Sequence, residues 1–422
     1  MSYAIQSKTG IEQNKLYRDD TGIHDWYRFV LSYPPHLVRN YINKFQLNAR
    51  HTILDPFCGT GTTLVESKKL AIPSIGIEAN PVVQMAAKAK VNWNIEGDAL
   101  IEHSLFIAKE VENELKDQGG NLKSLNVEKE KLIINNSISP LPLHKSLVFL
   151  EVLNDMIDER FYDIERTAFA KQLVYSYSNL NFGPEVGVSR KKKNDVDVVG
   201  LWVKEIQKIA TDLSEYASGK DIFSKVYLGD SRNIGRLLDN ESIDSIITSP
   251  PYPNEKDYTR TTRLESVLLD FMNVKTDLRQ NKEGLLRSNT RNIYKGDDDD
   301  KWIEKHQHIV ELADSIEARR IELGKTSGFE RLYHKVVKNY FGGMARHLED
   351  LKPLLRPGAQ LAYVVGEQAS YFQIPIQTGK LLSDIAVEMG YDLVNIDLFR
   401  TRLSTVTKAQ LREEVVLLRW KG

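Results

Sequence analysis

Cysteine is nearly absent from the chain, with Cys58 the only one in 422 residues. A single cysteine excludes an internal disulfide and a cysteine-based zinc site, and it is typical of a reducing compartment. The first residues also lack an apolar signal core, and no apolar run approaches the roughly 20 residues that cross a bilayer. We therefore expect a cytoplasmic protein without a membrane-spanning segment.

An excess of charge of either sign is missing as well. Lys and Arg total 57 against 58 Asp and Glu, which leaves a net charge of −1. Many nucleic-acid-binding proteins are basic overall, so a polyanion site in this chain has to come from local clusters such as "SRKKK" at 189–193. With 41% hydrophobic residues, the composition is that of a globular protein with one large core carrying insertions, or with two domains.

Strand and helix signals alternate in two parts of the chain. The stretch "HTILDPFCGTGTTLVESKKLAIPSIGIEANP" predicts a strand at 52–54, a Gly/Thr loop, a helix at 62–70 and a second strand at 74–80. Strand signals resume at "KVYLGD" and "SIDSIITSPPY", and then, after a helix at 334–354, at "QLAYVVGE", "DLVNIDLF" and "EEVVLLRW". This alternation predicts an α/β protein with a doubly wound, mainly parallel sheet.

Two long, mostly helical stretches interrupt this alternation. We expect a polar N-terminal arm (1–20), a first part of the core (21–98), a helical insertion (99–223), a further core segment (224–253), a second insertion (254–331) and a C-terminal part of the core (332–422). The acidic run "GDDDD" in the second insertion is expected to be a solvated loop rather than a metal site, and no metal is expected elsewhere.

The loop "LDPFCGTGTT" lacks the residues of two common phosphate-binding loops. Gly59 and Gly61 permit positive φ and a close approach of a ligand to the backbone. A P-loop requires lysine after the last glycine, and here Thr62 and Thr63 follow. A dinucleotide fingerprint requires a third glycine where this chain has Leu64. Both phosphate-binding interpretations therefore fail.

Two acidic residues favour a different ligand. Asp55 at the entrance of the loop would repel phosphate and suits a positively charged group. Glu78, 17 residues after Gly61, can accept hydrogen bonds from both ribose hydroxyls. A phosphate-free nucleoside with a cationic amino-acid end is S-adenosylmethionine. For its adenine amino group we favour Asp230 in "YLGDSRN", with Asp98 in "IEGDAL" as the alternative.

The corner "TSPPY" follows a strand predicted to be buried and has the chemistry to hold an amine. The Ser249 hydroxyl and the Pro250 carbonyl can accept the protons of an exocyclic amine, and Pro251 makes that geometry rigid before substrate arrives. The Tyr252 ring can stack on a base flipped out of a duplex. No covalent nucleophile is needed, and Cys58 has no neighbouring base to activate it, so we expect it to serve in packing.

"LDPFCGTGTT" together with "TSPPY" resembles the amino-methyltransferases of DNA, which form N4-methylcytosine or N6-methyladenine. The resemblance implies a class I S-adenosylmethionine-dependent methyltransferase fold, which is Rossmann-like, with two insertions. It implies a cofactor contact for Glu78 and Asp230 and for the loop residues Asp55, Pro56, Phe57, Cys58, Gly59, Thr60 and Gly61. It also implies a catalytic corner made of Ser249, Pro250, Pro251 and Tyr252. "WYRFVLSYPPHLV" is similar to the accessory cofactor motif of the family, which implies pocket contacts for Phe29 and residues 34–37.

The first residue of the Ser-Pro-Pro-Tyr corner indicates which base is modified. Serine at position 249 is typical of cytosine-N4 enzymes, whereas Asp or Asn is commoner in adenine-N6 enzymes. In many serine-type enzymes, however, the catalytic motif precedes the cofactor motif, and here the order is reversed. We expect a site-specific methyltransferase of double-stranded DNA acting on cytosine N4, with a cognate restriction or defence protein as companion. Adenine N6 stays open as the alternative target.

Two further hypotheses compete with a DNA methyltransferase. An RNA (tRNA) base-amine methyltransferase would usually carry Asp at position 249 and an RNA-binding domain ahead of the core, and only 54 residues precede Asp55. A nucleic-acid-binding protein that has lost catalysis would not be expected to keep Asp55, Glu78, Ser249 and Tyr252 intact.

Basic side chains in the two insertions could reach a duplex. In the first insertion Arg190, Lys191 and Lys192 can neutralise phosphates as a broad clamp. The second insertion follows the catalytic corner directly and is expected to border the target base. Its candidate DNA contacts are Arg260, Arg263, Arg287 and Arg291.

Overall fold

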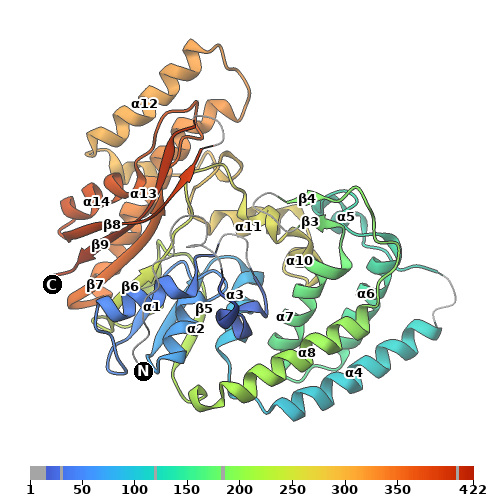
Figure 1. Cartoon of the computed structure of the whole chain (residues 1–422). Coiled ribbons are helices and arrows are strands. Elements are labelled where there is room, and N and C mark those ends of the chain that lie inside the picture. Colours follow the sequence, from blue (N-terminus) through green and yellow to red (C-terminus); the bar gives the residue numbers. More distant parts are fainter. Residues whose placement is uncertain (1–15, 29–31, 118–120, 182–185, 405–407) are drawn as a thin grey trace.

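The structure is a computed structural model that describes residues 16–28, 32–117, 121–181, 186–404 and 408–422. Seven strands form one sheet in the order β5-β2-β1-β6-β7-β9-β8 (Figure 1). The first five pair in parallel, and β9 runs antiparallel to both β7 and β8. The strands are β1 Ile53–Asp55, β2 Ser74–Glu78, β5 Ser224–Leu228, β6 Ile243–Thr248, β7 Leu355–Gly366, β8 Asp392–Leu403 and β9 Gln410–Arg419.

This order confirms the predicted doubly wound sheet and the class I methyltransferase fold. The strand sequence proceeds from β1 through β2 to β5 on one side and restarts at β6 on the other, so the connections reverse direction between β1 and β6. Such a reversal opens a crevice at the carboxyl ends of the two central strands, which is the usual ligand position in open α/β sheets. The candidate site should therefore lie above β1 and β6.

Apolar side chains cover both faces of the sheet, which explains why its central strands read as near-continuous hydrophobic runs. Neighbouring residues on β6 point to opposite faces, with Ile246 packed in one core and Ile247 in the other. Helix α1 (Pro35–Lys44) covers one face, while α13 (Tyr333–Leu351) and α14 (Thr378–Glu388) cover the other. The helix predicted at 334–354 is confirmed as α13.

Helix α2 (Thr62–Lys69) packs closely on β2 because Gly76 has no side chain. A Cβ built at Gly76 would lie 2.8 Å from both the Cys58 sulfur and a Leu64 methyl carbon. This contact brings the glycine-rich loop down onto the sheet. Cys58 is buried, as expected for a packing residue.

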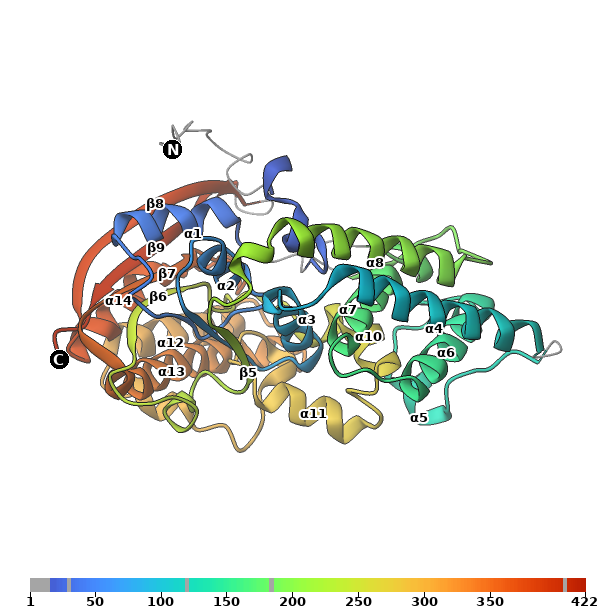
Figure 2. The same ribbon diagram turned by 90° about the horizontal axis from the view of Figure 1, so that it is seen from below.

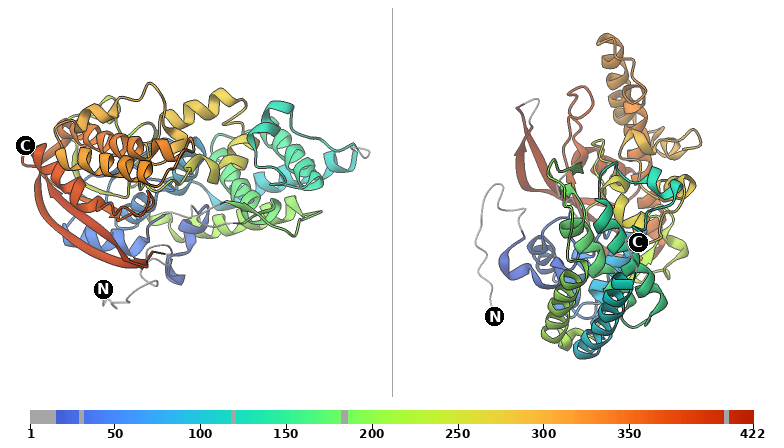
Figure 3. Two further views of the ribbon diagram at one scale, coloured as in Figure 1. Left: turned by 90° about the horizontal axis from the view of Figure 1, so that it is seen from above. Right: turned by 90° about the vertical axis from the view of Figure 1, so that its right-hand side faces the viewer.

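The first insertion folds as a helical lobe beyond the β5 edge of the sheet, at one end of an elongated molecule (Figures 2 and 3). Its core includes Phe149, Phe169 and Trp202 and is continuous with residues of α2 and α3. Strands β3 and β4 form a short two-stranded ribbon in this lobe. Helix α3 (Pro81–Val91) precedes the insertion. The helices and strands of the lobe are α4 Gly97–Asp117, α5 Val127–Leu132, α6 Pro140–Asp155, α7 Tyr162–Gln172, β3 Leu180–Asn181, β4 Gly187–Val188 and α8 Val198–Glu215.

The second insertion bridges this lobe and the sheet. Leu264 and Val267 on α10 belong to the core of the helical lobe, whereas Ile309 and Ile316 on α12 pack with α13 beneath the sheet. Its helices are α9 Tyr258–Thr261, α10 Arg263–Leu268, α11 Lys275–Glu283 and α12 Gln307–Glu322. Among the described helices, none combines the length and the apolar character needed to cross a membrane.

Only part of the acidic run at 297–300 is the solvated loop that its charge predicted, since Asp298 is exposed and Asp299 is not. Asp299 is only 3% exposed, and its carboxylate accepts a 2.5 Å bond from Arg232 and a 3.4 Å bond from Arg346. Arginines from distant segments supply the counter-charges that make this burial possible. Within the described ranges, no group of three or more His, Cys, Asp or Glu side chains is arranged to hold a metal ion.

Candidate active site

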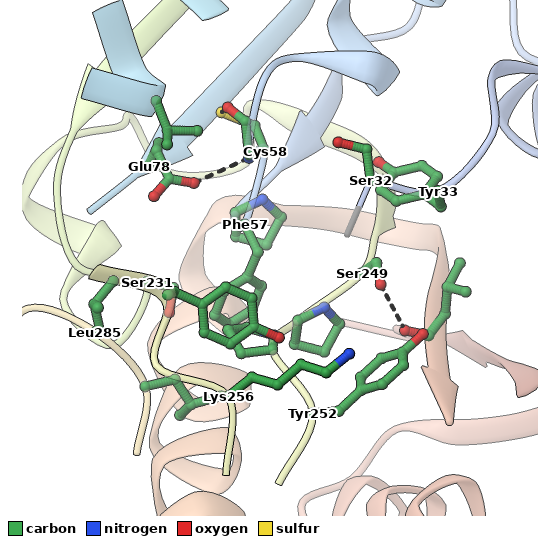
Figure 4. A pocket seen from close by; sticks show the side chains of 18 of the residues that line it. Ser32, Tyr33, Phe57, Cys58, Glu78, Ser231, Ser249, Tyr252, Lys256 and Leu285 are labelled. Atoms are coloured by element: carbon green, nitrogen blue, oxygen red, sulfur yellow. Dashed lines mark hydrogen bonds between the residues drawn. The ribbon is translucent and has the colours of Figure 1, made fainter. Parts of the chain in front are cut away.

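A cavity of about 470 Å³ lies above the carboxyl ends of β1, β2 and β6, where the sheet topology predicts a ligand (Figure 4). Its wall combines the glycine-rich loop, the end of β2 and the Ser-Pro-Pro-Tyr corner. The two motifs lie almost 200 residues apart in sequence, and parallel strands bring them to one edge of the sheet. Of the residues predicted for the site, the lining includes Pro56, Phe57, Cys58, Gly59, Glu78, Ser249, Pro250, Pro251 and Tyr252.

The glycine-rich loop adopts a conformation that favours glycine. Gly59 and Gly61 have φ of +51° and +82°, in the left-handed region. A Cβ built at Gly59 would meet no atom within 4 Å, so the loop backbone faces open space at this point. No lysine or arginine from the loop enters the cavity beside it. This surface suits a ligand that lies close to the loop backbone.

Glu78 ends β2 with its carboxylate in the cavity. One oxygen accepts the Gly59 backbone N–H at 3.0 Å, and the other accepts the Asn80 N–H at 2.8 Å. Burial raises the pKa of Glu78 to about 7, although both backbone hydrogen bonds oppose that shift. Each oxygen keeps a further lone pair, so the carboxylate can accept two hydroxyl donors.

Asp55 occupies a different place from the one expected. It is fully buried beneath the loop and is not among the described residues that line the cavity. Its carboxylate accepts hydrogen bonds from Thr248 Oγ1 at 2.6 Å and from the Tyr33 hydroxyl at 2.7 Å, and burial raises its pKa. Asp55 therefore links β1 to the last residue of β6. Its direct contact with a ligand stays a prediction.

Three other cofactor candidates also lie outside the lining among the described residues, namely Thr60, Gly61 and Asp230. The Asp230 carboxylate pairs with Arg232, whose Nη2 lies 2.6 Å from Oδ2, while the flanking Gly229 and Ser231 do line the cavity. The alternative, Asp98, is exposed at the start of α4. The adenine assignment therefore stays a prediction for either residue.

The Ser-Pro-Pro-Tyr corner leaves β6 directly after Thr248. The Ser249 hydroxyl donates to the Val364 carbonyl of β7 at 3.1 Å (Figure 4). Its one proton is thereby engaged, which leaves the oxygen lone pairs to accept from a ligand. The Tyr252 ring lies against Gly366 at the end of β7, where a Cβ would be 2.9 Å from the ring. Burial raises the pKa of Tyr252, so the phenol is protonated at neutral pH.

Several lining residues were not predicted from the sequence. Ser32 and Tyr33 precede Pro34, within the stretch whose family resemblance suggested Phe29 and residues 34–37. Phe29 lies outside the described residues. Lys256 and Tyr258 follow the Ser-Pro-Pro-Tyr corner, and Arg400 enters from β8. The only sequence signal for Lys256 and Tyr258 was their proximity to the corner.

The candidate DNA contacts differ in exposure. Arg190, Lys191 and Lys192 are exposed on the loop that follows β4. Arg287 is 5% exposed, donates to three backbone carbonyls and pairs with Asp297 at 2.8 Å. That burial removes Arg287 from the side chains that can meet a duplex at the surface.

The other three arginines of the second insertion are more accessible. Arg260 and Arg291 are exposed, with Arg291 over the Phe329 ring at 5.7 Å. Arg263 is partly buried and donates to the Leu132 carbonyl of the helical lobe at 3.3 Å. Their contact with DNA stays a prediction.

Comparison with known proteins identifies similar sequences. The family model for N6/N4 methyltransferases, described as DNA methylase, matches residues 7–88, which include the glycine-rich loop and Glu78. The Type II methyltransferase M.BsoBI of Geobacillus stearothermophilus is 26% identical over 419 residues, which cover 90% of this chain and 81% of that protein. The Type II methyltransferase M.AvaI of Nostoc sp. is 24% identical over 413 residues, which cover 88% of this chain and 79% of that protein.

Similarity to a solved structure is weaker. TrmN from Thermus thermophilus is 12% identical, with a TM-score of 0.27. The alignment covers 92% of this chain and 48% of that structure. A likeness at this level does not bear on fold or function.

Proposed function

This chain belongs to the DNA amino-methyltransferase family, and we propose that it methylates the exocyclic N4 amine of cytosine in a specific sequence of double-stranded DNA. S-adenosylmethionine is the methyl donor. When bound, it supplies a methyl group on a sulfonium, which an amine can attack directly. The observation that carries the proposal is the cavity itself, in which Glu78 and the open backbone at Gly59 face the same space as Ser249 and Tyr252.

The residues present fit this cofactor. Glu78 would accept the ribose hydroxyls, as its carboxylate lies in the cavity with lone pairs available. The loop backbone at Gly59 and the side chains of Ser32 and Tyr33 would surround the amino-acid end. A cavity of about 470 Å³ has the size of a small-molecule site.

Ser249 and Pro250 would orient the target amine. An exocyclic amine is a weak nucleophile because its lone pair is delocalised into the ring. Two fixed acceptors aimed at its protons favour the tetrahedral geometry that it needs in order to attack. Ser249 can accept since its own proton is donated to Val364. The proton released after transfer passes to solvent or to one of these acceptors.

Tyr252 would hold the flipped base by stacking, and Gly366 gives its ring room to lie along β7. Covalent catalysis is not part of this proposal. Cys58 is buried, and burial raises the pKa of its thiol well above the ordinary value, so the reactive thiolate is suppressed.

Serine at position 249 is what favours cytosine N4 over adenine N6. The similarity to Type II methyltransferases supports a role in restriction–modification, with a cognate restriction enzyme or another defence protein as companion. Duplex contacts are proposed for Arg190, Lys191, Lys192, Arg260, Arg263 and Arg291.

The test is to incubate the protein with labelled S-adenosylmethionine and either duplex DNA or tRNA, and to identify the modified nucleoside by mass spectrometry. N4-methylcytosine in DNA is the expected product. N6-methyladenine would overturn the choice of base, and transfer to tRNA alone would overturn the choice of DNA.

A further inference from the structure

Part of the wall of the active-site cavity comes from the second insertion. Residues 284–286, which follow α11, line the cavity. Figure 4 shows Leu285 and Ser231 on the left, on the side of Glu78, and Tyr252 on the right. Because Glu78 is the proposed partner of the ribose, the wall at 284–286 is placed to contact the nucleoside end of the cofactor.

Two buried arginines hold this wall by its backbone. Arg232 donates through Nη2 to the Glu283 carbonyl at 2.8 Å. Arg287 donates through Nη1 to the carbonyls of Glu283 and Leu285, at 3.1 Å and 2.6 Å. A guanidinium carries five donors in a fixed plane, so it can bond several acceptors at once and fix the segment that carries them.

Each of these arginines is paired with an aspartate of the acidic run. Arg287 Nη2 lies 2.8 Å from Asp297 Oδ1, and Arg232 Nη1 lies 2.5 Å from Asp299 Oδ2. The side chains of both aspartates are buried, with 8% and 4% exposed, whereas Asp298 between them is exposed. A buried guanidinium that loses its carboxylate partner is strongly unfavourable. Alternate residues of the run therefore neutralise the two arginines that hold the wall.

Arg232 also fixes the turn that follows β5. Its Nε donates to Asp230 Oδ1 at 2.9 Å, and its Nη2 donates to Asp230 Oδ2 at 2.6 Å. Gly229 and Ser231, on either side of Asp230, line the cavity. One guanidinium thus joins this turn to the wall at 284–286, and Asp299 supplies its second counter-charge.

Helix α13 leaves room for the acidic run to approach closely. A Cβ built at Gly342 would lie 1.9 Å from the Asp299 carbonyl oxygen. A Cβ at Gly343 would lie 2.6 Å from a Leu286 methyl carbon and 3.3 Å from the Asp299 carboxylate. Two consecutive glycines lower the stability of a helix, and here they let Asp299 and the cavity wall pack on the same part of α13.

We propose that Asp297 and Asp299 are positioning residues for cofactor binding, which act through Arg287 and Arg232 on the cavity wall at 284–286. The inference rests on the proposed function, in which this cavity holds S-adenosylmethionine. Neither aspartate is among the described residues that line the cavity. Their role is to keep the wall in place before the cofactor arrives, so that binding does not have to order it.

The test is the affinity of D297N and D299N for S-adenosylmethionine and for S-adenosylhomocysteine, measured by calorimetry without DNA. Asn keeps the shape of Asp and removes the charge that pairs with the arginine. Each variant is expected to bind both ligands about 10-fold more weakly, because both ligands carry the same nucleoside and one charge-assisted hydrogen bond has this order of effect. The kcat at saturating cofactor should change much less, since Ser249 and Tyr252 lie on the other side of the cavity.

The matched control is D298N, which removes the exposed carboxylate between the two aspartates. It should bind both ligands as the wild type does. Thermal unfolding without ligand shows whether each variant folds. If D299N does not fold, R232K takes its place and should show the same loss of affinity, because lysine keeps the charge but cannot bond Asp230, Asp299 and Glu283 together.

The inference is overturned if the D297N and D299N variants bind S-adenosylmethionine as tightly as D298N does, or if their loss falls on kcat alone. A loss of thermal stability with unchanged affinity would also overturn it, because the ion pairs would then support only the fold. Failure of the proposed function has a different signature, since the wild type itself would not bind S-adenosylmethionine or would not methylate cytosine in DNA.

Discussion

The hydroxyl of Thr248 donates to the carboxylate of Asp55 at 2.6 Å, so the last residue before the Ser-Pro-Pro-Tyr corner is bonded to the first residue of the glycine-rich loop. Both groups are fully buried, and the bond spans adjacent parallel strands. Asp55 also accepts from Tyr33, which lines the cavity. One carboxylate thus fixes three segments of the site relative to one another, and its role is to position them.

Removing this bond should uncouple the two motifs. T248V keeps the shape of the side chain and deletes the donor, leaving Asp55 short of one partner in a buried position. We expect a loss of about 1–3 kcal/mol in the free energy of unfolding and a larger fractional loss of kcat than of cofactor affinity. Chemical denaturation, calorimetry and steady-state kinetics measure the three quantities. S245A is the control, because Ser245 on the same strand donates to the Gln360 carbonyl away from the cavity. Equal losses of kcat in both variants would contradict the positioning role.

Cofactor binding should depend on pH through Glu78. Its pKa in the protein is raised to about 7, and the ribose hydroxyls would need the ionised form as acceptor. Affinity for S-adenosylmethionine should therefore approach its full value only well above pH 7 and should fall as the pH drops through 7, by up to about tenfold per pH unit if only the carboxylate form binds. Calorimetry between pH 5.5 and 7.5 measures this change. E78Q should bind weakly with no pH dependence over that range, and a parallel pH dependence in E78Q would show that another group titrates.

Methyltransferase activity should depend on the aromatic ring of Tyr252 more than on its hydroxyl. Y252A removes the stacking surface and should lose most turnover while still binding the cofactor, as base–aromatic stacking is worth about 1–3 kcal/mol. Y252F keeps the ring and loses only the hydroxyl. We expect it to retain most activity. If both variants are equally inactive, the hydroxyl rather than stacking is essential.

Gly366 should be required for the position of that ring. A Cβ at this residue would lie 2.9 Å and 3.3 Å from two carbons of Tyr252, so G366A must displace the ring or the strand. We expect a loss of kcat with cofactor affinity near the wild-type value. G296A is the control, since a Cβ there meets nothing within 4 Å. Wild-type turnover in G366A would mean that the ring can move without consequence.

Much of the core could be predicted because its signals are local. The apolar run of β6 ends at the Ser-Pro-Pro-Tyr corner, and the glycines at 59 and 61 break the chain between β1 and α2, so neighbouring residues alone identify these elements. The order of strand and helix signals then predicts a parallel sheet and a ligand at its carboxyl edge. Charged residues were predicted less well. Arg287 and Asp299 were expected at the surface and are buried, because their counter-charges come from residues that sequence spacing does not reveal.

By itself, the sequence determined the α/β class, the glycine-rich loop, the acidic end of β2 and the Ser-Pro-Pro-Tyr corner, since each is encoded within a few consecutive residues. Only the tertiary structure decided how they work together. It placed Val364 to take the Ser249 proton, Gly366 beneath Tyr252, Asp55 between two strands and Asn289 behind Lys256. The two residues in each of these contacts are separated by between 33 and 193 positions in the sequence. The geometry of the contacts follows from strand register and packing, which a short stretch of sequence does not reveal.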